Sequence, residues 1–421
     1  MTEEQSAINL EQNETIRIPK EWKEVKLQEV LTLLRNGLVK KQNKDGKGYP
    51  ITRIETISDE KIDITKVGYI EHITQNEIDL YKLTEGDILF SHINSLVHIG
   101  KTAIYDGKPS ALLHGMNLLI LRSNKSFVFP MFLLYQLRYL RMKDLFRNIA
   151  KKAVNQASIN QTELGKVGIP LPPLPEQRKI AEILGTVDKA IEKVEQAIEK
   201  ADRLKKGLMQ ELLTKGIGHK EFKESEIGRI PKEWEVVKLG DKDVSNLIMG
   251  QSPPSSTYNK KGEGLPFLQG KAEFGEIHPT PLLYCSRPIK IAEKNDVLLS
   301  VRAPVGDVNI ASLKSCIGRG LTTIRPKNNR LYYLYLFYYL IFKKRIFKSL
   351  STGSTFKAIR RSEIENYLIP LPSLPEQQKI AEILDTVDKR RELLKVKKQI
   401  FERVKRELMN DLLTGRKRVK V

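Results

Sequence analysis

Two long stretches of the chain carry apolar residues at intervals of three and four, with charged residues between them. In residues 175–213 the two intervals alternate, which is the heptad pattern of a coiled coil. The second stretch starts at residue 375 and has a similar stripe, although Arg391 and Lys398 interrupt it. We therefore predict two long amphipathic helices. The first stripe comprises Ile180, Leu184, Val187, Ile191, Val194, Ile198 and Ala201, and continues through Leu204, Leu208 and Leu212 after a phase shift.

Both predicted helices begin with almost the same segment. Residues 171–189 and 371–389 differ only at Pro173/Ser373, Arg178/Gln378 and Gly185/Asp385. The Pro-Glu-Gln at each start favours a helix N-terminus, because proline needs no partner for a donor there and the helix dipole stabilises a carboxylate. Glycines 216 and 415 predict where the helices end. The chain therefore contains an internal duplication.

The length of the first helix indicates what covers its apolar face. A helix over residues 175–213 is a rod of roughly 60 Å at 1.5 Å per residue, which is too long to bury its stripe against one small domain. We expect the two helices to pair as an antiparallel coiled coil. The alternative, two unrelated surface helices packed on separate cores, remains open at this point.

The duplicated unit is larger than the helix. Ile-Pro-Lys-Glu-Trp occurs at residues 18–22 and again at 230–234, whereas the segments between these openings and the helices diverge. The divergent segments still share a skeleton of short β-rich runs followed by a helix. The strands are predicted at 49–53 and 265–269, 87–91 and 296–300, and 115–122 and 318–325; the helices are predicted at 130–149 and 330–350.

These elements predict a mixed α/β (α+β) fold. It has two globular domains separated by two long antiparallel coiled-coil helices, in an internal pseudo-twofold repeat. The expected order is a polar tail (1–17), a first domain (18–170), a first spacer helix (171–215), a linker (216–229), a second domain (230–370), a second spacer helix (371–415) and a basic tail (416–421).

Composition narrows the class of partner. The chain has 72 Lys and Arg against 51 Asp and Glu, a formal net charge of +21, which favours a polyanion such as nucleic acid. Two cysteines make neither a disulfide framework nor a metal quartet, and the six histidines form no helical ligand pair, so we expect no metal. The acidic N-terminus is no signal peptide, and the apolar run 331–342 is too short to span a membrane. We expect a cytoplasmic protein.

Catalytic motifs are incomplete in this sequence. Residues 95–102 lack the first glycine of a phosphate-binding loop. The segment 252–255, Ser-Pro-Pro-Ser, lacks the amide and the aromatic ring of an amino-methyltransferase tetrad. No glycine-rich cofactor fingerprint follows a strand. We therefore assign no catalytic residue and no cofactor to this chain.

The duplicated helix start, the two Ile-Pro-Lys-Glu-Trp openings and the two divergent domains resemble the specificity subunit of type I restriction-modification systems, from about residue 16 to 415. The hallmark is Leu-Pro-x-Leu-Pro-Glu-Gln leading into Ile-Ala-Glu-Ile-Leu at the end of each half. The resemblance implies two target recognition domains, each reading one half of a split, asymmetric site in double-stranded DNA. It also implies that two modification (methyltransferase) subunits, and restriction subunits in the full complex, dock on the scaffold. S-adenosylmethionine, ATP and Mg then belong to those partners.

Candidate DNA contacts follow from the loops after the shared strands, where Arg can read guanine and Asn or Gln can read adenine. In the first domain they are Arg53, His92, Asn94 and Lys101; in the second they are Gln269, Lys271, Arg302 and Arg319. Candidate phosphate contacts are Lys343, Lys344, Arg345, Lys357, Arg360 and Arg361. Candidate partner-docking residues are Trp22, Trp234, Glu176, Gln177, Glu376 and Gln377.

Two other functions remain open at this stage. One is a fused DNA methyltransferase with an atypical site, which would bind S-adenosylmethionine by itself. The other is a coiled-coil scaffold that binds proteins and no DNA. Salt-dependent binding to duplexes separates the scaffold from a DNA reader.

Overall fold

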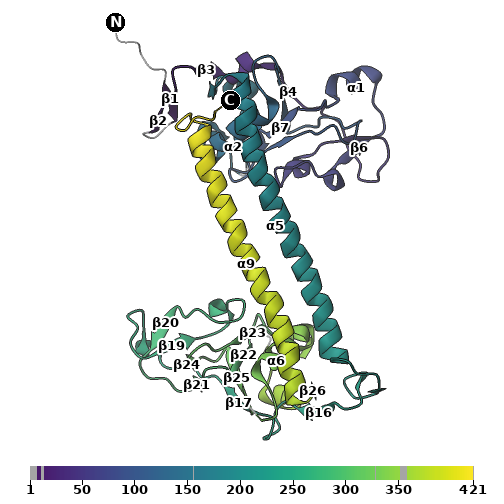
Figure 1. The fold of residues 1–421 in the computed structure, drawn as a ribbon, viewed down its shortest axis with the longest axis vertical. Coiled ribbons are helices and arrows are strands. Elements are labelled where there is room, and N and C mark those ends of the chain that lie inside the picture. The colour runs from purple at the N-terminus through teal and green to yellow at the C-terminus, as the bar shows by residue number, and fades with distance from the viewer. Residues whose placement is uncertain (1–6, 11–13, 155, 328, 351–357, 421) are drawn as a thin grey trace. The chain divides into compact units, whose positions relative to one another are not determined.

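The computed structural model describes residues 7–10, 14–154, 156–327, 329–350 and 358–420. The chain forms two compact units. Unit 1 comprises Met1–Val194 and Lys397–Val421, and unit 2 comprises Glu195–Val396. Each unit therefore combines one α/β domain with one half of each long helix (Figure 1). The helices are not separate spacers, because their ends bury apolar side chains in the domain cores.

The two predicted long helices are α5, Leu174–Lys215, and α9, Leu374–Leu412. Within unit 1, Ile180 and Leu184 of α5 share a core with Met409 and Leu412 of α9. Within unit 2, Met209 and Leu212 of α5 share a core with Ile380, Ala381 and Leu384 of α9. The start of one helix packs on the end of the other in both units, so the predicted antiparallel pairing is confirmed.

The predicted apolar stripe is only partly correct. Ile180, Leu184, Val194 and Ala201 are buried, but Leu204 is 54% exposed and Val404 on α9 is 41% exposed. Heptad spacing identifies the helix face that is apolar, whereas burial also depends on the charged side chains that occupy the middle of the helix pair.

Both domains are built on the same four-stranded antiparallel sheet, which confirms the shared skeleton. In unit 1 the strand order is β4-β10-β7-β9, and in unit 2 it is β17-β25-β22-β23. The first sheet comprises β4 (Leu31–Asn36), β10 (Leu118–Ser123), β7 (Ile88–Ser91) and β9 (Thr102–Ile104). The second comprises β17 (Ser245–Met249), β25 (Leu321–Pro326), β22 (Val297–Ser300) and β23 (Val308–Ile310).

A two-stranded ladder joins the beginning of each domain to its end. In unit 1, β3 (Lys23–Lys26) pairs with β13 (Gly168–Leu171). In unit 2, β16 (Glu235–Lys238) pairs with β26 (Leu368–Leu371). Because β13 and β26 lead directly into α5 and α9, these ladders fix where each long helix leaves its domain.

The outer strands differ between the units. Unit 1 has one pair and one three-stranded sheet: β5 (Tyr49–Ile51) with β6 (Gly68–Ile70), and β11 (Lys151–Lys152), β12 (Ala157–Ser158) and β8 (Ile93–Asn94). Unit 2 has a five-stranded sheet of β18 (Tyr258–Asn259), β20 (Leu283–Cys285), β19 (Leu265–Leu268), β24 (Ser315–Ile317) and β21 (Ile291–Ala292). Short helices are α1 (Gln75–Tyr81), α4 (Gln161–Gly165) and α8 (Arg361–Glu365).

The late helix of each domain was predicted as one piece, which is wrong. The first consists of α2 (Pro130–Met142) and α3 (Leu145–Ile149), because Asp144 between them has a φ of 58° and cannot continue a right-handed helix. The second consists of α6 (Tyr333–Phe342) and α7 (Lys344–Leu350), which meet at Lys343. Both α2 and α6 are packed in the domain cores. Among the described residues, no helix is long and apolar enough to cross a membrane.

Three segments predicted as tails or a linker have structure of their own. Within the expected polar tail, β1 (Ala7–Leu10) pairs with β2 (Glu14–Arg17). Within the expected linker, β14 (Phe222–Lys223) pairs with β15 (Ile230–Pro231). In the basic tail, Arg418 is bound to Glu21. The sequence did not predict these contacts, because strands of two to four residues and single ion pairs produce no periodic pattern of apolar residues.

Two buried histidines make unit 1 sensitive to acid. Burial lowers the pKa of both His92 and His114 to about 4. An unfolded histidine has a pKa near 6.5, so the unfolded chain binds more protons between these values, and stability is lost as the pH falls from about 6.5 towards 4. We expect one such histidine to cost unit 1 about 2 kcal/mol between pH 7.5 and 5.0.

The chain has two tryptophans, one in each unit, so Trp22 fluorescence in a Trp234→Phe background reports unit 1. Urea unfolding at the two pH values should show a smaller pH dependence for His92→Gln than for the parent. The exposed His72 provides the control, since His72→Gln should leave the pH dependence unchanged. Equal pH dependence in parent and His92→Gln would contradict the assignment.

Candidate nucleic-acid interface and its mounting

The glutamine at the start of α5 joins the helix to its domain. Gln177 is fully buried, and its Oε1 accepts a hydrogen bond from the backbone N–H of Phe129 at 2.8 Å. Its Nε2 donates to the carbonyls of Phe127 and Pro172 at 2.9 and 2.8 Å. The loop that leads into α2 is therefore held directly against the helix start.

The preceding glutamate binds two further segments. Trp22 Nε1 donates to Glu176 Oε2 at 3.0 Å, and the Arg418 guanidinium donates to both carboxylate oxygens at 2.7 and 2.9 Å. Hydrogen bonding to Glu176 and Glu21 raises the pKa of Arg418 above its ordinary value. Because Glu176 is only 3% exposed, these hydrogen bonds take the place of water at its carboxylate. We call the Glu-Gln pair and its partners the latch.

Unit 2 repeats the latch with a histidine in place of the arginine. Gln377 accepts from the N–H of Tyr332 at 2.8 Å and donates to the carbonyls of Arg330 and Pro372, each at 2.9 Å. Trp234 Nε1 donates to Glu376 at 3.0 Å, and a ring nitrogen of His219 lies 2.8 Å from the same carboxylate. Histidine thus occupies the place that arginine holds in unit 1.

The latch corrects the predicted docking surface. Trp22, Glu176, Gln177, Trp234 and Gln377 are buried, and Glu376 is bonded within unit 2. These six residues therefore offer little free surface for partner docking, since five are buried and Glu376 is bonded within unit 2. Their recurrence in both halves reflects how each domain is mounted on its helix.

An aspartate inside each half of the helix pair binds the other helix and the domain together. In unit 1, Asp188 of α5 accepts from Tyr135 of α2 at 2.8 Å and pairs with Lys405 of α9 at 2.6 Å. Burial raises the pKa of Tyr135, so its hydroxyl stays protonated and donates. Each aspartate therefore connects three elements of its unit.

In unit 2 the roles of the two helices are exchanged. Asp388 of α9 accepts from Tyr338 of α6 at 3.0 Å and pairs with Lys205 of α5 at 2.7 Å. Burial likewise raises the pKa of Tyr338. The reciprocal contact confirms that the duplication extends to the packing of the helices.

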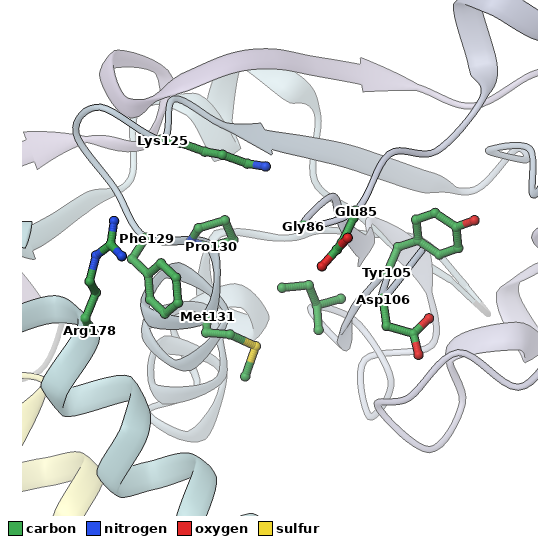
Figure 2. Close-up of a pocket in the computed structure, with 10 residues that line it drawn as sticks. Glu85, Gly86, Tyr105, Asp106, Lys125, Phe129, Pro130, Met131 and Arg178 are labelled. Carbon is green, nitrogen blue, oxygen red and sulfur yellow. The ribbon is translucent and has the colours of Figure 1, made fainter. Parts of the chain in front are cut away.

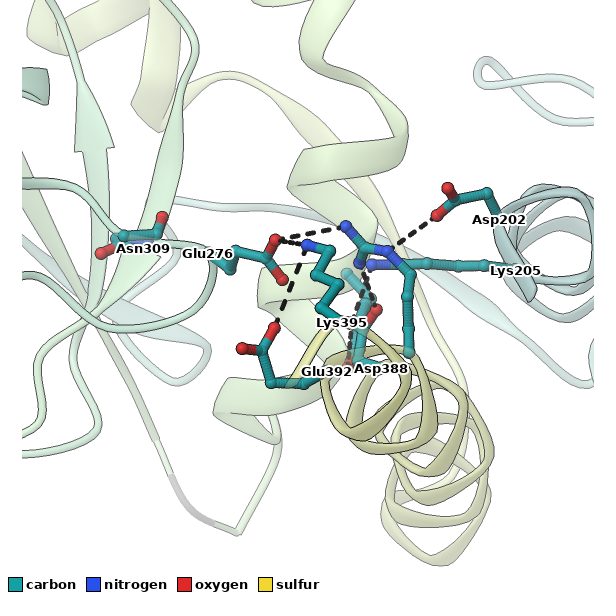
Figure 3. Close-up of polar contacts among 10 residues, drawn as sticks. Asp202, Lys205, Glu276, Asn309, Asp388, Glu392 and Lys395 are labelled. Carbon is teal, nitrogen blue, oxygen red and sulfur yellow. Dashed lines mark hydrogen bonds and ion pairs between the residues drawn. The ribbon is translucent and has the colours of Figure 1, made fainter. Parts of the chain in front are cut away.

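Arg391, which interrupts the second stripe, is part of an ion-pair network rather than a defect. It lies 2.7 Å from Asp202 on α5, 3.1 Å from Asp388 and 3.4 Å from Glu276 (Figure 3). Lys395 also pairs with Glu276, which belongs to the domain. The network replaces apolar contacts between the helix halves and attaches the second domain to α9.

The first domain uses most of its predicted DNA contacts internally. His92 is 6% exposed, and burial lowers its pKa to about 4, so its contact with DNA stays a prediction that this buried position does not favour. Asn94 donates to Ser91 and accepts from the backbone of Ser95, and Lys101 donates to the carbonyl of Ser58. Arg53 remains, held by Gln42 at 3.1 Å and Glu55 at 3.3 Å beside an open hollow.

The second domain keeps its predicted side chains at the surface. Gln269, Lys271, Arg302 and Arg319 are all exposed. Lys271 forms an ion pair with Asp307 at 2.9 Å, and Arg319 Nε lies 3.3 Å from Ser252 Oγ. The structure therefore leaves all four accessible to a ligand.

The predicted phosphate contacts divide into three groups. Lys344 is paired with Asp307, and Lys343 is half-buried, which lowers its pKa. Arg345, Arg360 and Arg361 are exposed, and Arg361 also contacts Glu365 at 2.7 Å. Lys357 lies outside the described residues.

A cavity of about 360 Å³ lies in unit 1 beside the start of α5. Figure 2 shows Lys125 and Arg178 towards one side and Glu85 and Asp106 towards the other. The Arg178 guanidinium stacks over the Phe129 ring at 5.5 Å. The cavity thus combines cationic, anionic and apolar side chains.

The sequence was compared with models of known protein families. The family described as type I restriction modification DNA specificity domain matches residues 19–201 and 231–403, once over each half. This chain belongs to that family.

Relatives and solved structures agree over nearly the whole length. The putative type I restriction enzyme MjaX specificity subunit of Methanocaldococcus jannaschii is 54% identical over 98% of this chain and 97% of its own length. The MjaVIII specificity subunit of the same organism is 29% identical over 98% of this chain and 96% of its own length. A chain from a type I restriction-modification system, solved to explain complex assembly and conformational transition, is 29% identical with a TM-score of 0.60, over 94% of this chain and 98% of that one.

A further solved relative supports the fold alone. The S subunit of a type I restriction-modification system from M. genitalium has a TM-score of 0.61 at 16% identity, over 96% of this chain and 98% of that one. The fold of a type I specificity subunit is thus retained where little sequence is shared.

The sequence analysis did not identify several residues that hold the domains and helices of this specificity subunit together. They include the aspartates, Asp188 and Asp388, and two residues that bind the latch glutamates, Arg418 and His219. A signal for the aspartates was present, because they occupy the same place in the nearly identical segments 171–189 and 371–389. A signal for Arg418 and His219 was absent, since they occupy unrelated sequence contexts. Within the described residues, no group of three or more His, Cys, Asp or Glu is placed to hold a metal ion.

The latch predicts a large difference between two neighbouring glutamines. Gln377→Ala leaves the N–H of Tyr332 and the carbonyls of Arg330 and Pro372 without their partner, which should destabilise unit 2 by about 3 kcal/mol. Gln378→Ala is the matched control, since Gln378 is exposed on the same turn and should change stability by less than about 0.5 kcal/mol.

Amide hydrogen exchange read by mass spectrometry distinguishes the two variants. Peptides covering residues 330–342 and 374–384 should lose protection in Gln377→Ala and keep it in Gln378→Ala. If both variants exchange like the parent, Gln377 does not hold the domain to the helix.

Proposed function

We propose that this chain is the DNA sequence-recognition subunit of a type I restriction-modification complex, in which each domain reads one half of a split, asymmetric site. The observation that carries the proposal is the contrast inside the duplication. The two domains share a strand order and a latch, whereas their outer sheets and surface loops differ. Identical mounting with different surfaces is what two distinct half-sites require.

Charge supports DNA as the ligand. The net charge of +21 favours association with a polyanion, and the exposed side chains of the second domain include guanidinium, ammonium and amide groups. Arginine and glutamine donors read guanine and adenine edges in the major groove. The length of the two helices would set the gap between the half-sites.

The long helices supply a surface for the modification subunits. Leu393, Val396, Ile400 and Val404 of α9 follow one another at intervals of three and four, so they lie on one face of the helix. They are 70%, 44%, 43% and 41% exposed. A contiguous exposed apolar stripe marks an interaction site in a well-packed protein. We assign this stripe, rather than the latch residues, to partner docking.

The chemistry would then reside on the partners. We assign no catalytic residue to this chain, and place S-adenosylmethionine, ATP and Mg on the modification and restriction subunits. The family match and the incomplete catalytic motifs of the sequence support this division of labour.

The proposal predicts steeply salt-dependent DNA binding. The chain assembled with its modification subunits should bind duplex DNA with a log affinity that falls linearly with log salt, because phosphate contacts release counterions. Fluorescence anisotropy between about 50 and 200 mM salt should show a loss of at least about 10³-fold if six or more phosphates are contacted.

Two results would contradict this function. A complex that assembles but shows no salt-dependent DNA binding is a protein scaffold. An isolated chain that binds S-adenosylmethionine in a calorimeter is a fused methyltransferase.

The exposed stripe predicts where assembly fails. Leu393→Lys combined with Ile400→Lys should weaken binding to a modification subunit at least about ten-fold, since charges replace the apolar contact. The matched control is Gln399→Lys, an exposed neighbour that adds charge outside the stripe. Light scattering on the mixed subunits measures assembly, and equal assembly of the stripe variant and the control would exclude this face.

A further inference from the structure

Three segments of the first domain meet where no side chain fits between their backbones. Gly37 follows β4, Gly115 precedes β10 and Thr52 follows β5. A Cβ added to Gly37 would collide with the Gly115 carbonyl, and one added to Gly115 would collide with the Thr52 carbonyl. We call this meeting point the crossing. Glycine is required where backbones approach this closely.

Hydrogen bonds between the segments fix the crossing. The N–H of Leu38 donates to the His114 carbonyl at 2.9 Å, and the N–H of Thr52 donates to the Leu113 carbonyl at 2.9 Å. The N–H of Gly115 donates to Thr52 Oγ1 at 2.9 Å. The segments therefore form a rigid frame rather than independent loops.

The second domain contains the same crossing although its sequence diverges there. Gly250 follows β17, and a Cβ on it would collide with the carbonyl of Gly318, which precedes β25. The N–H of Gln251 donates to the Ile317 carbonyl at 3.1 Å, and that of Gly318 donates to the Leu268 carbonyl at 2.8 Å. These bonds match Gly37 with Gly250 and Gly115 with Gly318, and they place Gln269 where the first domain has Arg53.

The side chains on this common frame differ in chemistry. In the first domain, Gln42, Arg53 and Asn117 line a hollow of about 260 Å³ together with Lys40, Ile54, Glu55 and Met116. Met116 is 39% exposed, so an apolar side chain lies open beside the polar ones. In the second domain the corresponding surface carries Ser252, Gln269 and Arg319.

This chemistry suits the edges of bases. Arginine binds guanine through two donors, and asparagine or glutamine binds adenine through a donor and an acceptor. An exposed aliphatic side chain meets the methyl group of thymine. A rigid frame also reduces the entropy lost when these side chains engage a ligand.

We infer that the crossing is the base-reading site of each domain, with Gln42, Arg53 and Asn117 in the first and Ser252, Gln269 and Arg319 in the second. This inference rests on the proposed function and names the residues that carry it out. His92, Asn94 and Lys101 are not included, because they are not among the residues that line the hollow at the crossing. The two half-sites then differ because the second domain has Gln269 where the first has Arg53, and Arg319 where the first has Met116.

The test replaces Arg53 and Gln269 each by the residue type that its counterpart has in the other domain. The chain is assembled with modification subunits, and bound duplexes are selected from a library of random sequence and read by sequencing. Arg53→Gln should shift the preference at one position of one half-site from guanine towards adenine, by about ten-fold or more. Gln269→Arg should make the opposite shift in the other half-site. The control is Arg147→Ala, an exposed arginine outside the crossing, which should leave both half-sites unchanged.

The outcomes separate this inference from the proposed function. If the parent complex selects no split sequence, the proposed function fails. If the parent selects one and both exchange variants select the same sequence, only the crossing is excluded. In each variant the unaltered half-site reports correct folding, so loss of both half-sites would show that the residue supports the fold and would also overturn the inference.

Discussion

The structure depends on the hydrogen bonds of two buried glutamine side chains at the starts of the long helices. Gln177 and Gln377 each accept one hydrogen bond and donate two. Each binds backbone groups of the loop that leads into α2 or α6 and the carbonyl of the proline that precedes its own helix. A buried amide with an unpaired atom is costly, so the orientation of a domain on its helix has little freedom. Residues on the surface of a domain can therefore change without altering the orientation of that domain on its helix.

Much of the fold was predictable because the duplication shows the same pattern of helix and strand residues twice in one sequence. The helices, their antiparallel pairing and the shared strands follow from periodicity and from the repeated segments. The break at Asp144 and the pairing of β1 with β2 were not predictable, since one positive φ and a short polar ladder leave no period in the sequence. Boundaries of compact units were also hidden, because each helix contributes to two cores.

The site was less predictable than the fold. Residue type and position after a strand identified Arg53, Gln269 and Arg319, which the structure leaves accessible. The same reasoning selected His92, whose environment is a core, and Trp22, whose ring nitrogen binds Glu176. Sequence shows which groups are capable of recognition, but only packing decides which of them are already satisfied within the chain.

The way the chain is divided between the two units has a consequence for folding during synthesis. Unit 2 is one uninterrupted segment, whereas unit 1 combines residues that precede this segment with residues that follow it, among them Arg418. A ribosome delivers residues in order, so every part of unit 2 has been synthesised while Glu176 still lacks its guanidinium. The half that is translated first is thus the one that is completed last.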